Sequence, residues 1–449
     1  MNHNTSLLLF ALAAVVALVI LIARFKFHPF VALMLVAILI GWHSGMKLPA
    51  IAKAFQDGMG HTLGFLGVVV GLGMMLGKML TESGGARVVA QTLVRIVGNN
   101  RLPWAMLITA LLVGVPVLFS VGLLLLLPVI VSIARETQKP FLALGIPLVA
   151  GLSVSQGLLP PHPGPMLAIE QLGADVGKTM MYGALIGLPT AIVAGPIFAT
   201  LVTQRLQAGP NEIVQKAAPT ESNKSQPGFA ITLLTILLPV LLILLATLAD
   251  LSLPKGNRWR EYADFVGGPL IAMLVALLFS LYSFGYARGF TGRQILKFLE
   301  ECLNPAAGIL LVVGAGGGLS KILESGGVGD VIASGVAHAR LSPLILAWLV
   351  AASIRVAVGS ATVAITMASA IMAPVASNVP GINRELLVLA MGAGSSFLSH
   401  VNDGGFWLVK ESFHLTVPQT LKTWTVLETG VGLVGLLLVL LLDAFIGHH

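Results

Sequence analysis

The sequence predicts an all-α polytopic membrane protein made of two inverted repeats, each with a re-entrant helical hairpin and a broken helix, together with scaffold helices. The first observation is composition: of 449 residues, 56% are hydrophobic and only 10% are charged, with a mean hydropathy of +0.93, whereas soluble domains carry roughly 25% charged residues. The second is a series of apolar runs long enough to cross a bilayer. The third is an internal repeat of the motifs that interrupt these runs.

The apolar runs follow one another along the whole chain and leave no stretch for a sizeable soluble domain. The first run has no Lys or Arg before it and is followed at once by Arg24 and Lys26, so it is predicted to be a retained span and not a cleaved signal peptide. Runs of transmembrane length lie at roughly 6–23, 28–46, 61–80, 229–249, 264–285, 301–323 and 426–446. Less regular apolar stretches, rich in glycine and proline, lie at 103–134, 141–203 and 342–415.

The positive charges indicate how the chain is oriented in the membrane. The net charge is +7, but Lys and Arg are scattered through short loops, as membrane orientation alone would produce, so nucleic-acid binding is not expected. Arg101 and Arg135 fall on the same predicted cytoplasmic side. The segment between them, 103–134, is therefore predicted to be a re-entrant hairpin or, as an alternative, two short full spans. A second hairpin is predicted at 342–376.

The two halves of the chain repeat each other. Residues 77–90 match residues 320–333, and residues 151–179 align without gaps to residues 392–420. The positions of the positive charges in the loops predict that the spans at the first pair of matching segments cross the membrane in opposite directions. The repeats are therefore predicted to be inverted. Inverted repeats with interrupted helices indicate a secondary transporter whose site lies near the bilayer midplane.

These features divide the chain into predicted parts. The only long polar segment, rich in Pro, Gly and Ser, lies near the middle and is expected to be a linker between the halves. The predicted parts are N-terminal scaffold helices at 1–58, a first repeat at 59–205 with a hairpin at about 103–134 and a broken helix at about 141–178, a cytoplasmic linker at 206–228, connecting scaffold helices at 229–290, and a second repeat at 291–449 with a hairpin at about 342–376 and a broken helix at about 384–418.

A proline-rich run interrupts the first broken helix. Pro160, Pro161 and Pro163 lack the N–H group that a helix interior needs, so the helix is predicted to end near Leu159. Its second half can restart with Pro165 in the first turn. A surface turn is the alternative, but long apolar stretches flank the run on both sides. Unwound chain is tolerated at membrane depth only where protein or a water-filled cavity surrounds it.

The matching position in the second repeat is also predicted to be a break. Asn402 or Asp403 can cap a helix that begins at Gly404. Both breaks would then direct a helix N-terminus, worth about half a positive charge, toward the centre of the protein. Together with Gly164 in the first break, this arrangement predicts an anion site made largely without side-chain charge.

The second predicted hairpin carries the other candidate residues. Gly359, Ser360 and Thr362 suit a hairpin tip whose N–H groups and hydroxyls can bind a polyol or a carboxylate, although small residues also serve close helix packing. Arg355 lies in an apolar context, where an arginine costs about 2.5–3.5 kcal/mol or more and therefore needs an anionic partner. That partner is predicted to be the substrate, with Asp403 or a lipid phosphate as alternatives.

Three titratable residues at the breaks have two interpretations each. His162 and His400 can carry a proton at physiological pH or can simply hydrogen-bond neighbouring backbone, and Asp403 can bind an ion or a hydroxyl or act only as a helix cap. The single cysteine, Cys302, excludes an internal disulfide and a thiolate metal cluster. No metal and no cofactor are expected, and an intramembrane enzyme is disfavoured because no His-Glu-x-x-His or paired-aspartate motif occurs.

Taken together, these motifs make the chain similar to the gluconate permease family of proton symporters. The motifs that carry the resemblance are PPHPGP at 160–165, GSATVA at 359–364, HVNDGGFW at 400–407, the paired segments GKML and SKILESGG, and the flanking segments ARFKFHPFVAL at 23–33 and TWTVLET at 423–429. The resemblance implies membership of an ion transporter superfamily whose members look like dimers with a scaffold domain and a transport domain. It therefore implies elevator-type movement.

Two positions differ from the family pattern. Ser120 stands before Val121-Gly122 where an acidic residue is common, and Gln156 stands before Gly157 where a histidine is common. His162, Asp403 and His400 are then the residues left to carry a proton.

The sequence therefore predicts a secondary active importer, in the cell inner membrane, of a small hydroxylated carboxylate such as gluconate or a related sugar acid, driven by protons. The expected partners are the sugar acid, protons, the lipid bilayer and a second copy in a homodimer. Another small organic anion, an amino acid, or sodium coupling remain alternatives. The predicted substrate-binding residues are Ser120, Ser153, Ser155, Gln156, His162, Gly164, Arg355, Gly359, Ser360, Thr362, Asn402, Asp403 and Gly404.

Overall fold

The computed structural model describes residues 24–203, 225–254, 256–327, 342–379 and 381–446, with scattered positions between residues 10 and 22. The described residues form helices joined by short turns, without a strand, and nine of these helical segments are long and apolar enough to cross a membrane. The predicted all-α polytopic class is confirmed. Most of the linker at 206–228, parts of the first span at 6–23 and the repeat residues 328–333 lie outside the described residues.

The first half of the molecule has three labelled helices that precede the hairpin region. Its helices are α2 (Pro29–His43), α3 (Leu48–Glu82), α4 (Gly85–Val97), α5 (Leu102–Gly114), α6 (Phe119–Thr137), α7 (Phe141–Leu158), α8 (Pro163–Leu172) and α9 (Val176–Ile192), and α9 continues through the π-turn η2 (Val193–Ile197) into α10 (Phe198–Thr203).

The second half of the molecule contains the remaining helices. Its helices are α12 (Phe229–Ser252), α13 (Arg258–Gly267), α14 (Pro269–Ser280), α15 (Gly292–Glu301), α16 (Asn304–Ser325), α18 (Pro343–Val358), α19 (Ala361–Asn378), α20 (Arg384–Ser396), α21 (Gly404–Ser412), α22 (Val417–Thr420) and α23 (Val426–Ile446), with the π-turn η5 (Leu421–Thr425) between the last two.

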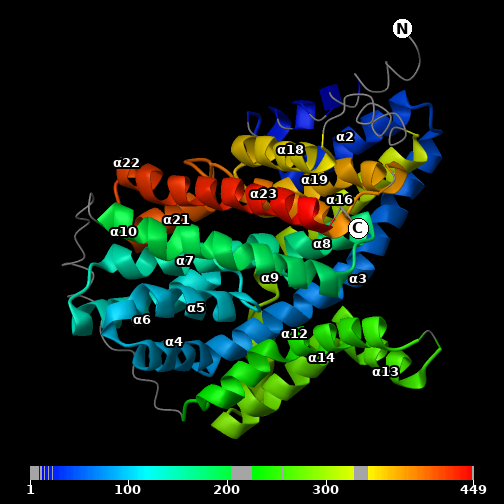
Figure 1. Cartoon of the computed structure of the whole chain (residues 1–449). Helices are drawn as coiled ribbons and strands as arrows, with labels where there is room; N and C mark the ends of the chain where they lie inside the picture. The colour runs from blue at the N-terminus through cyan, green and yellow to red at the C-terminus, as the bar shows by residue number, and fades with distance from the viewer. Residues whose placement is uncertain are drawn as a thin grey trace.

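Helix packing places the broken helices at the centre. The long α3 packs along α16 and also contacts α14, and in Figure 1 it runs across the molecule toward the group formed by α12, α13 and α14. In the first half α5 packs along α7, and in the second half α18 packs in the same way along α20. The α7–α8 segment is the most enclosed candidate span, because 83% of its most apolar 18-residue stretch is buried. In the segment that contains α23, only 22% of the corresponding stretch is buried.

Glycines set the distance between the two broken helices. α7 and α20 cross where Gly157 meets Gly392, and a side chain on Gly392 would run into the carbonyl oxygen of Gly157. Only residues without a Cβ allow two backbones to approach so closely, as at packed membrane helix interfaces. The crossing holds both helix breaks in one region of the protein interior.

Several predicted helix boundaries need correction. α3 begins at Leu48, well before the predicted start at 61. The prediction was too short because Lys53, Gln56 and Asp57 in the first turns lower the mean hydropathy, although they fit a helix. The predicted span at 264–285 begins within the separate surface helix α13 and restarts at Pro269. α13 and α15, which are short and amphipathic, are not predicted by the apolar runs.

Candidate functional site

The first helix break separates α7 from α8 by a short irregular segment. α7 ends at Leu158, and α8 begins with Pro163 at its first position, earlier than the predicted Pro165. Proline suits the first position of a helix because the N–H group there has no partner within the helix. The Pro160–Pro161 bond is cis. His162 is the N-cap residue of α8, but its side chain does not bond the helix and points elsewhere.

Two side chains of this break hold the first hairpin. His162 is 3% exposed, and its Nε2 donates to the carbonyl oxygen of Gly114 at 2.5 Å, at the C-terminal end of α5. Gln156 Oε1 accepts from the backbone N–H of Phe119 at 2.9 Å, at the first residue of α6. The break thus satisfies one carbonyl and one N–H group that would otherwise be left without a partner at the tip of the hairpin.

The second helix break lies between α20 and α21 and contains a buried ion pair. Arg355, at the C-terminal end of α18, is 3% exposed, and its Nη2 lies 2.6 Å from Asp403 Oδ2. Asp403 is also the N-cap residue of α21, where its Oδ1 accepts from Gly405 N–H at 2.9 Å. Of the predicted partners of Arg355, the structure therefore shows Asp403, and the capped helix begins at Gly404 as predicted. Arg355 Nε and Nη1 are buried without a hydrogen-bond partner.

The second hairpin is held in much the same way as the first. His400 Nε2 donates to the Val356 carbonyl at 3.0 Å, and Asn402 Nδ2 donates to the same carbonyl at 2.8 Å. Gly359 ends α18 with φ of 79°, in the left-handed region that favours glycine, and Ser360 caps α19 by accepting from Val363 N–H. The hairpin tip predicted at Gly359 and Ser360 is where the chain turns.

The structure sorts the predicted site residues into two neighbouring groups. At the first break it places Ser155, Gln156, His162 and Gly164, with Ser120 exposed at the start of α6. At the second break it places Arg355, Gly359, Ser360, Thr362, His400, Asn402, Asp403 and Gly404. Ring contact between Phe119 and Trp424, whose centroids are 5.1 Å apart, links the two groups.

Sequence reasoning missed one acidic residue at this site. Glu428, on α23, is 3% exposed. It interacts with Ser153 through a side-chain hydrogen bond and lies within electrostatic reach of Arg355 and Asp403. An acid within a long apolar run is a functional candidate by default. Glu428, however, lies near the start of its run, within the segment TWTVLET that carries part of the family resemblance.

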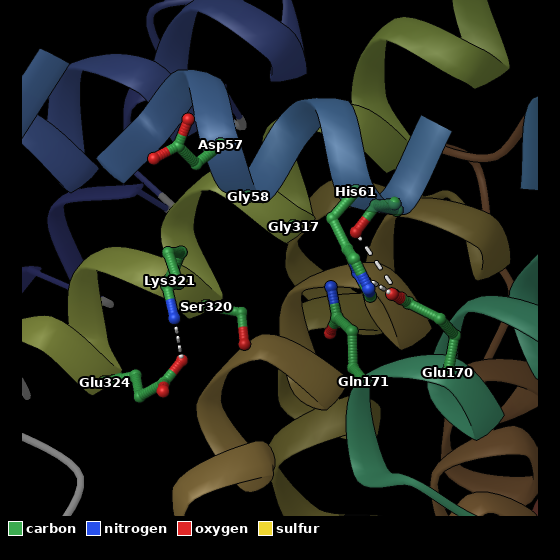
Figure 2. A pocket seen from close by; sticks show the side chains of 10 residues that line it. Asp57, Gly58, His61, Glu170, Gln171, Gly317, Ser320, Lys321 and Glu324 are labelled. Carbon is green, nitrogen blue, oxygen red and sulfur yellow. Dashed lines mark hydrogen bonds and ion pairs between the residues drawn. The ribbon is translucent and has the colours of Figure 1, made fainter. Parts of the chain in front are cut away.

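A polar cavity of about 380 Å³ opens at a different place, between α3, α8 and α16 (Figure 2). His61 Nδ1 lies 2.7 Å from Glu170 Oε1, and the opposite wall carries the Lys321–Glu324 ion pair at 3.0 Å. Gln171 projects into the region between them, and its two side-chain polar atoms are buried without a partner. None of the predicted site residues lines this cavity. Its lining residues are Asp57, Gly58, His61, Thr62, Glu170, Gln171, Gly317, Ser320, Lys321 and Glu324.

A polytopic helical fold with paired hairpins, interrupted helices and a buried ion pair between them is the architecture of a membrane transport protein. The GntP family permease model matches residues 6–445 of the chain. The chain belongs to this family and is a multi-pass transport protein of the inner membrane.

Curated relatives cover nearly the whole chain. It is 50% identical to the "Gluconate permease" of Pseudomonas aeruginosa over 444 residues, which cover 99% of each protein. It is 40% identical to a "High-affinity gluconate transporter" of Escherichia coli over 432 residues, covering 96% of this chain and 98% of the relative. A "Gnt-II system L-idonate transporter" of Escherichia coli is also 40% identical, with the same coverage.

Solved structures share the fold at much lower sequence identity. The YdaH transporter of Alcanivorax borkumensis is 20% identical with a TM-score of 0.64, and the match covers 94% of this chain and 98% of that one. MtrF of Neisseria gonorrhoeae is 15% identical with the same TM-score, over 94% of this chain and 96% of the other. These matches support the transporter fold.

Proposed function

We propose that the protein imports gluconate or a related sugar acid by proton symport, through elevator-type alternating access. Relatives at 40–50% identity carry the names gluconate permease and gluconate transporter, and one is named for L-idonate, which is also a sugar acid. The substrate class is therefore a small polyhydroxylated carboxylate. Another organic anion, an amino acid and sodium coupling are the alternatives.

The observation that carries the proposal is the state of Arg355. Its guanidinium is buried beside one carboxylate, yet two of its nitrogen groups have no acceptor. Buried N–H groups of a charged side chain are costly without a partner. A substrate carboxylate at this point would supply the missing acceptor and form a charge-assisted hydrogen bond. The N-terminus of α21 would add a favourable dipole.

The substrate hydroxyls are proposed to bind the small polar side chains nearby. Ser153, Ser155, Ser360, Thr362 and Asn402 each carry a hydroxyl or an amide at the breaks or at the tip of the second hairpin. Such groups can donate and accept, as a polyol requires. Because Asn402 now bonds the hairpin carbonyls, substrate entry requires the tip and the break to separate.

The polar cavity of Figure 2 is a proposed vestibule for the same substrate. Lys321 offers a cation for the carboxylate, and Ser320 and the unpartnered Gln171 offer groups for hydroxyls. The volume lies within the usual range for small-molecule sites, about 300–1,000 Å³.

Of the three residues predicted to carry a proton, Asp403 is proposed to belong to the proton path, and the two histidines are proposed to stabilise the hairpins. Asp403 lies in the charged cluster, whereas His162 and His400 each donate to a backbone carbonyl, an arrangement that a neutral imidazole satisfies. The proposed assembly is a homodimer in which hairpins and broken helices move against scaffold helices.

Transport assays in proteoliposomes test the proposal. Labelled gluconate should exchange in counterflow without any gradient and should accumulate when the outside is made acidic in sodium-free buffer. Competition by a panel of sugar acids, with aliphatic dicarboxylates and amino acids as controls, then ranks the substrates. Saturable uptake that needs sodium and ignores the pH gradient would contradict proton symport, and failure of every sugar acid to compete would contradict the substrate class.

A further inference from the structure

Glu428 is a buried carboxyl on a helix that otherwise faces mostly outward. Only 22% of the most apolar window of the α23 segment is buried, yet Glu428 is 3% exposed. Its Oε1 has no hydrogen-bond partner. An isolated buried carboxylate is strongly disfavoured in a membrane protein, so such a group normally pairs, binds an ion or holds a proton.

Helix packing places Glu428 beside the ion pair of the second break. The indole Nε1 of Trp348 donates to the Gly432 carbonyl at 2.9 Å, which fixes α18 against α23 one turn beyond Glu428. Arg355 follows Trp348 by two turns on the same helix. Glu428 also reaches across to the first broken helix, since its side chain bonds Ser153 of α7.

A hydrogen-bond chain links η5, the π-turn that leads directly into α23, to the same ion pair. Trp424, one turn before Glu428, donates from Nε1 to Ser399 Oγ at 2.8 Å. Ser399 in turn donates to Asp403 Oδ2, which also contacts Arg355. The Asp403 carboxylate is therefore already committed to the guanidinium, to Ser399 and to the N-cap of α21.

The charge balance of this cluster is incomplete. One guanidinium faces two carboxyl groups, so the cluster carries a net charge of −1 if both acids are ionised. Asp403 has its charge matched by Arg355, whereas Glu428 keeps an oxygen without any donor. Because buried net charge in a low-dielectric interior is expensive, one proton bound at Glu428 neutralises the cluster.

Other titratable groups do not face Glu428 closely enough to change this balance. Among the described residues, Arg355 and Asp403 are the charged groups that act on it. α7 has no ionisable side chain, and the ionisable residues of α9 and α20 lie near the N-terminal ends of those helices. Lys422 of η5 is exposed.

We propose that Glu428 is the site that binds and releases the coupling proton, and that it senses substrate through the Arg355–Asp403 pair. A substrate carboxylate beside Arg355 would compete with Asp403 for the guanidinium and add a further negative charge. The added charge would favour protonation of Glu428, so anion and proton would load together. The inference rests on the proposed sugar-acid symport and assigns its proton to a residue.

The test compares Glu428→Gln with the wild type in proteoliposomes, with Asp443→Asn near the end of the same helix as the matched control. For a carrier of one proton, a gradient of one pH unit drives about a tenfold accumulation of gluconate. The wild type and Asp443→Asn should accumulate gluconate in this way. Glu428→Gln should only equilibrate it, while counterflow exchange continues and loses its pH dependence.

The outcomes separate this inference from the proposed function. If the wild type does not accumulate gluconate in a pH gradient, proton symport fails. If the wild type accumulates it and Glu428→Gln does so equally with an unchanged pH profile, the role of Glu428 is overturned.

A second measurement needs no variant and applies even if Glu428→Gln does not fold. Dicyclohexylcarbodiimide reacts with protonated carboxyls in apolar surroundings, and mass spectrometry of the labelled wild-type protein identifies the site. Labelling at Glu428 that decreases as the pH is raised supports the inference. Labelling of other carboxyls without Glu428 at any pH contradicts it.

Discussion

The two helix breaks hold their hairpins in a similar way but differ in charge. In each, a histidine donates to a carbonyl at the end of the first hairpin helix, His162 to Gly114 and His400 to Val356. The first break adds only neutral groups, whereas the second adds the buried Arg355–Asp403 pair. Two helix breaks can thus share the kind of hydrogen bond that stabilises them while the buried charged groups lie at only one of them.

Two acidic residues that align between the two halves of the sequence also differ in their surroundings. Glu170 follows the first break, is 11% exposed and contacts His61 in the cavity of Figure 2. Glu411, its counterpart in the sequence alignment, is 71% exposed and pairs with the adjacent Lys410. Glu170 therefore faces the cavity, and Glu411 faces outward.

Replacement of Asp403 by alanine should have the largest effect. It leaves the buried guanidinium of Arg355 unpaired, at a cost of about 3–5 kcal/mol, and removes the cap of α21, worth about 1 kcal/mol. Thermal unfolding in detergent and the amount of protein in the membrane measure the loss. Asp403→Asn keeps an oxygen for the cap and should lose less, and an Asp403→Ala protein as stable as the wild type would contradict a structural role for this pair.

At the first break, His162→Ala should lower the free energy of unfolding by about 1–3 kcal/mol, because the Gly114 carbonyl loses its donor in a buried site. Proton coupling of the remaining transport should persist, with an unchanged pH profile. Gluconate uptake across a series of pH gradients provides the measurement, and His400→Ala is the matched variant at the second break. Loss of coupling with stability intact would instead make His162 a proton carrier.

Gly359→Ala should destabilise the second hairpin by about 1–3 kcal/mol, since the residue would occupy a left-handed conformation and its Cβ would run into the backbone of Asn402. Gly404→Ala is a suitable control because no atom lies near its Cβ position. Comparison of the two melting temperatures checks the prediction. Equal values would show that the hairpin tip does not need the close contact between Gly359 and Asn402.

The smallest effect is expected at Glu411. The exposed Glu411→Gln should change stability by less than about 0.5 kcal/mol and leave uptake unaltered. Glu170→Gln removes the contact with His61 in the proposed vestibule and should raise the gluconate concentration needed for half-maximal uptake. Initial rates over a range of gluconate concentrations distinguish the variants, and equal behaviour of both would remove the cavity from the substrate path.

The interruptions in the apolar runs were enough to predict much of this fold. The proline residues predicted the position of the first break. Asp403, followed by two glycines, predicted the second break and the start of the helix after it, because both patterns depend on local backbone chemistry. α3 was predicted too short because polar residues within a long helix lower the mean hydropathy without breaking it. The inversion of the repeats, the elevator movement and the dimer stay predictions.

The candidate site was less predictable because its partners are distant in sequence. The contact between Arg355 and Asp403 joins residues 48 positions apart and was one of several alternatives. Glu428 is brought to the same cluster by the packing of α23 on α7 and α18, which no local pattern encodes. The cavity of Figure 2 combines residues of α3, α8 and α16, and its polar groups looked like ordinary helix surfaces in the sequence.

Binding of gluconate to the purified protein and to its Arg355→Ala variant tests the central claim most directly, because it requires neither a gradient nor a complete transport cycle. Titration calorimetry should detect saturable binding to the wild type and none to the variant, with the folded state of each confirmed by its melting curve. Gluconate binding of equal affinity to a folded Arg355→Ala protein would contradict the claim that the charged second break holds the substrate carboxylate.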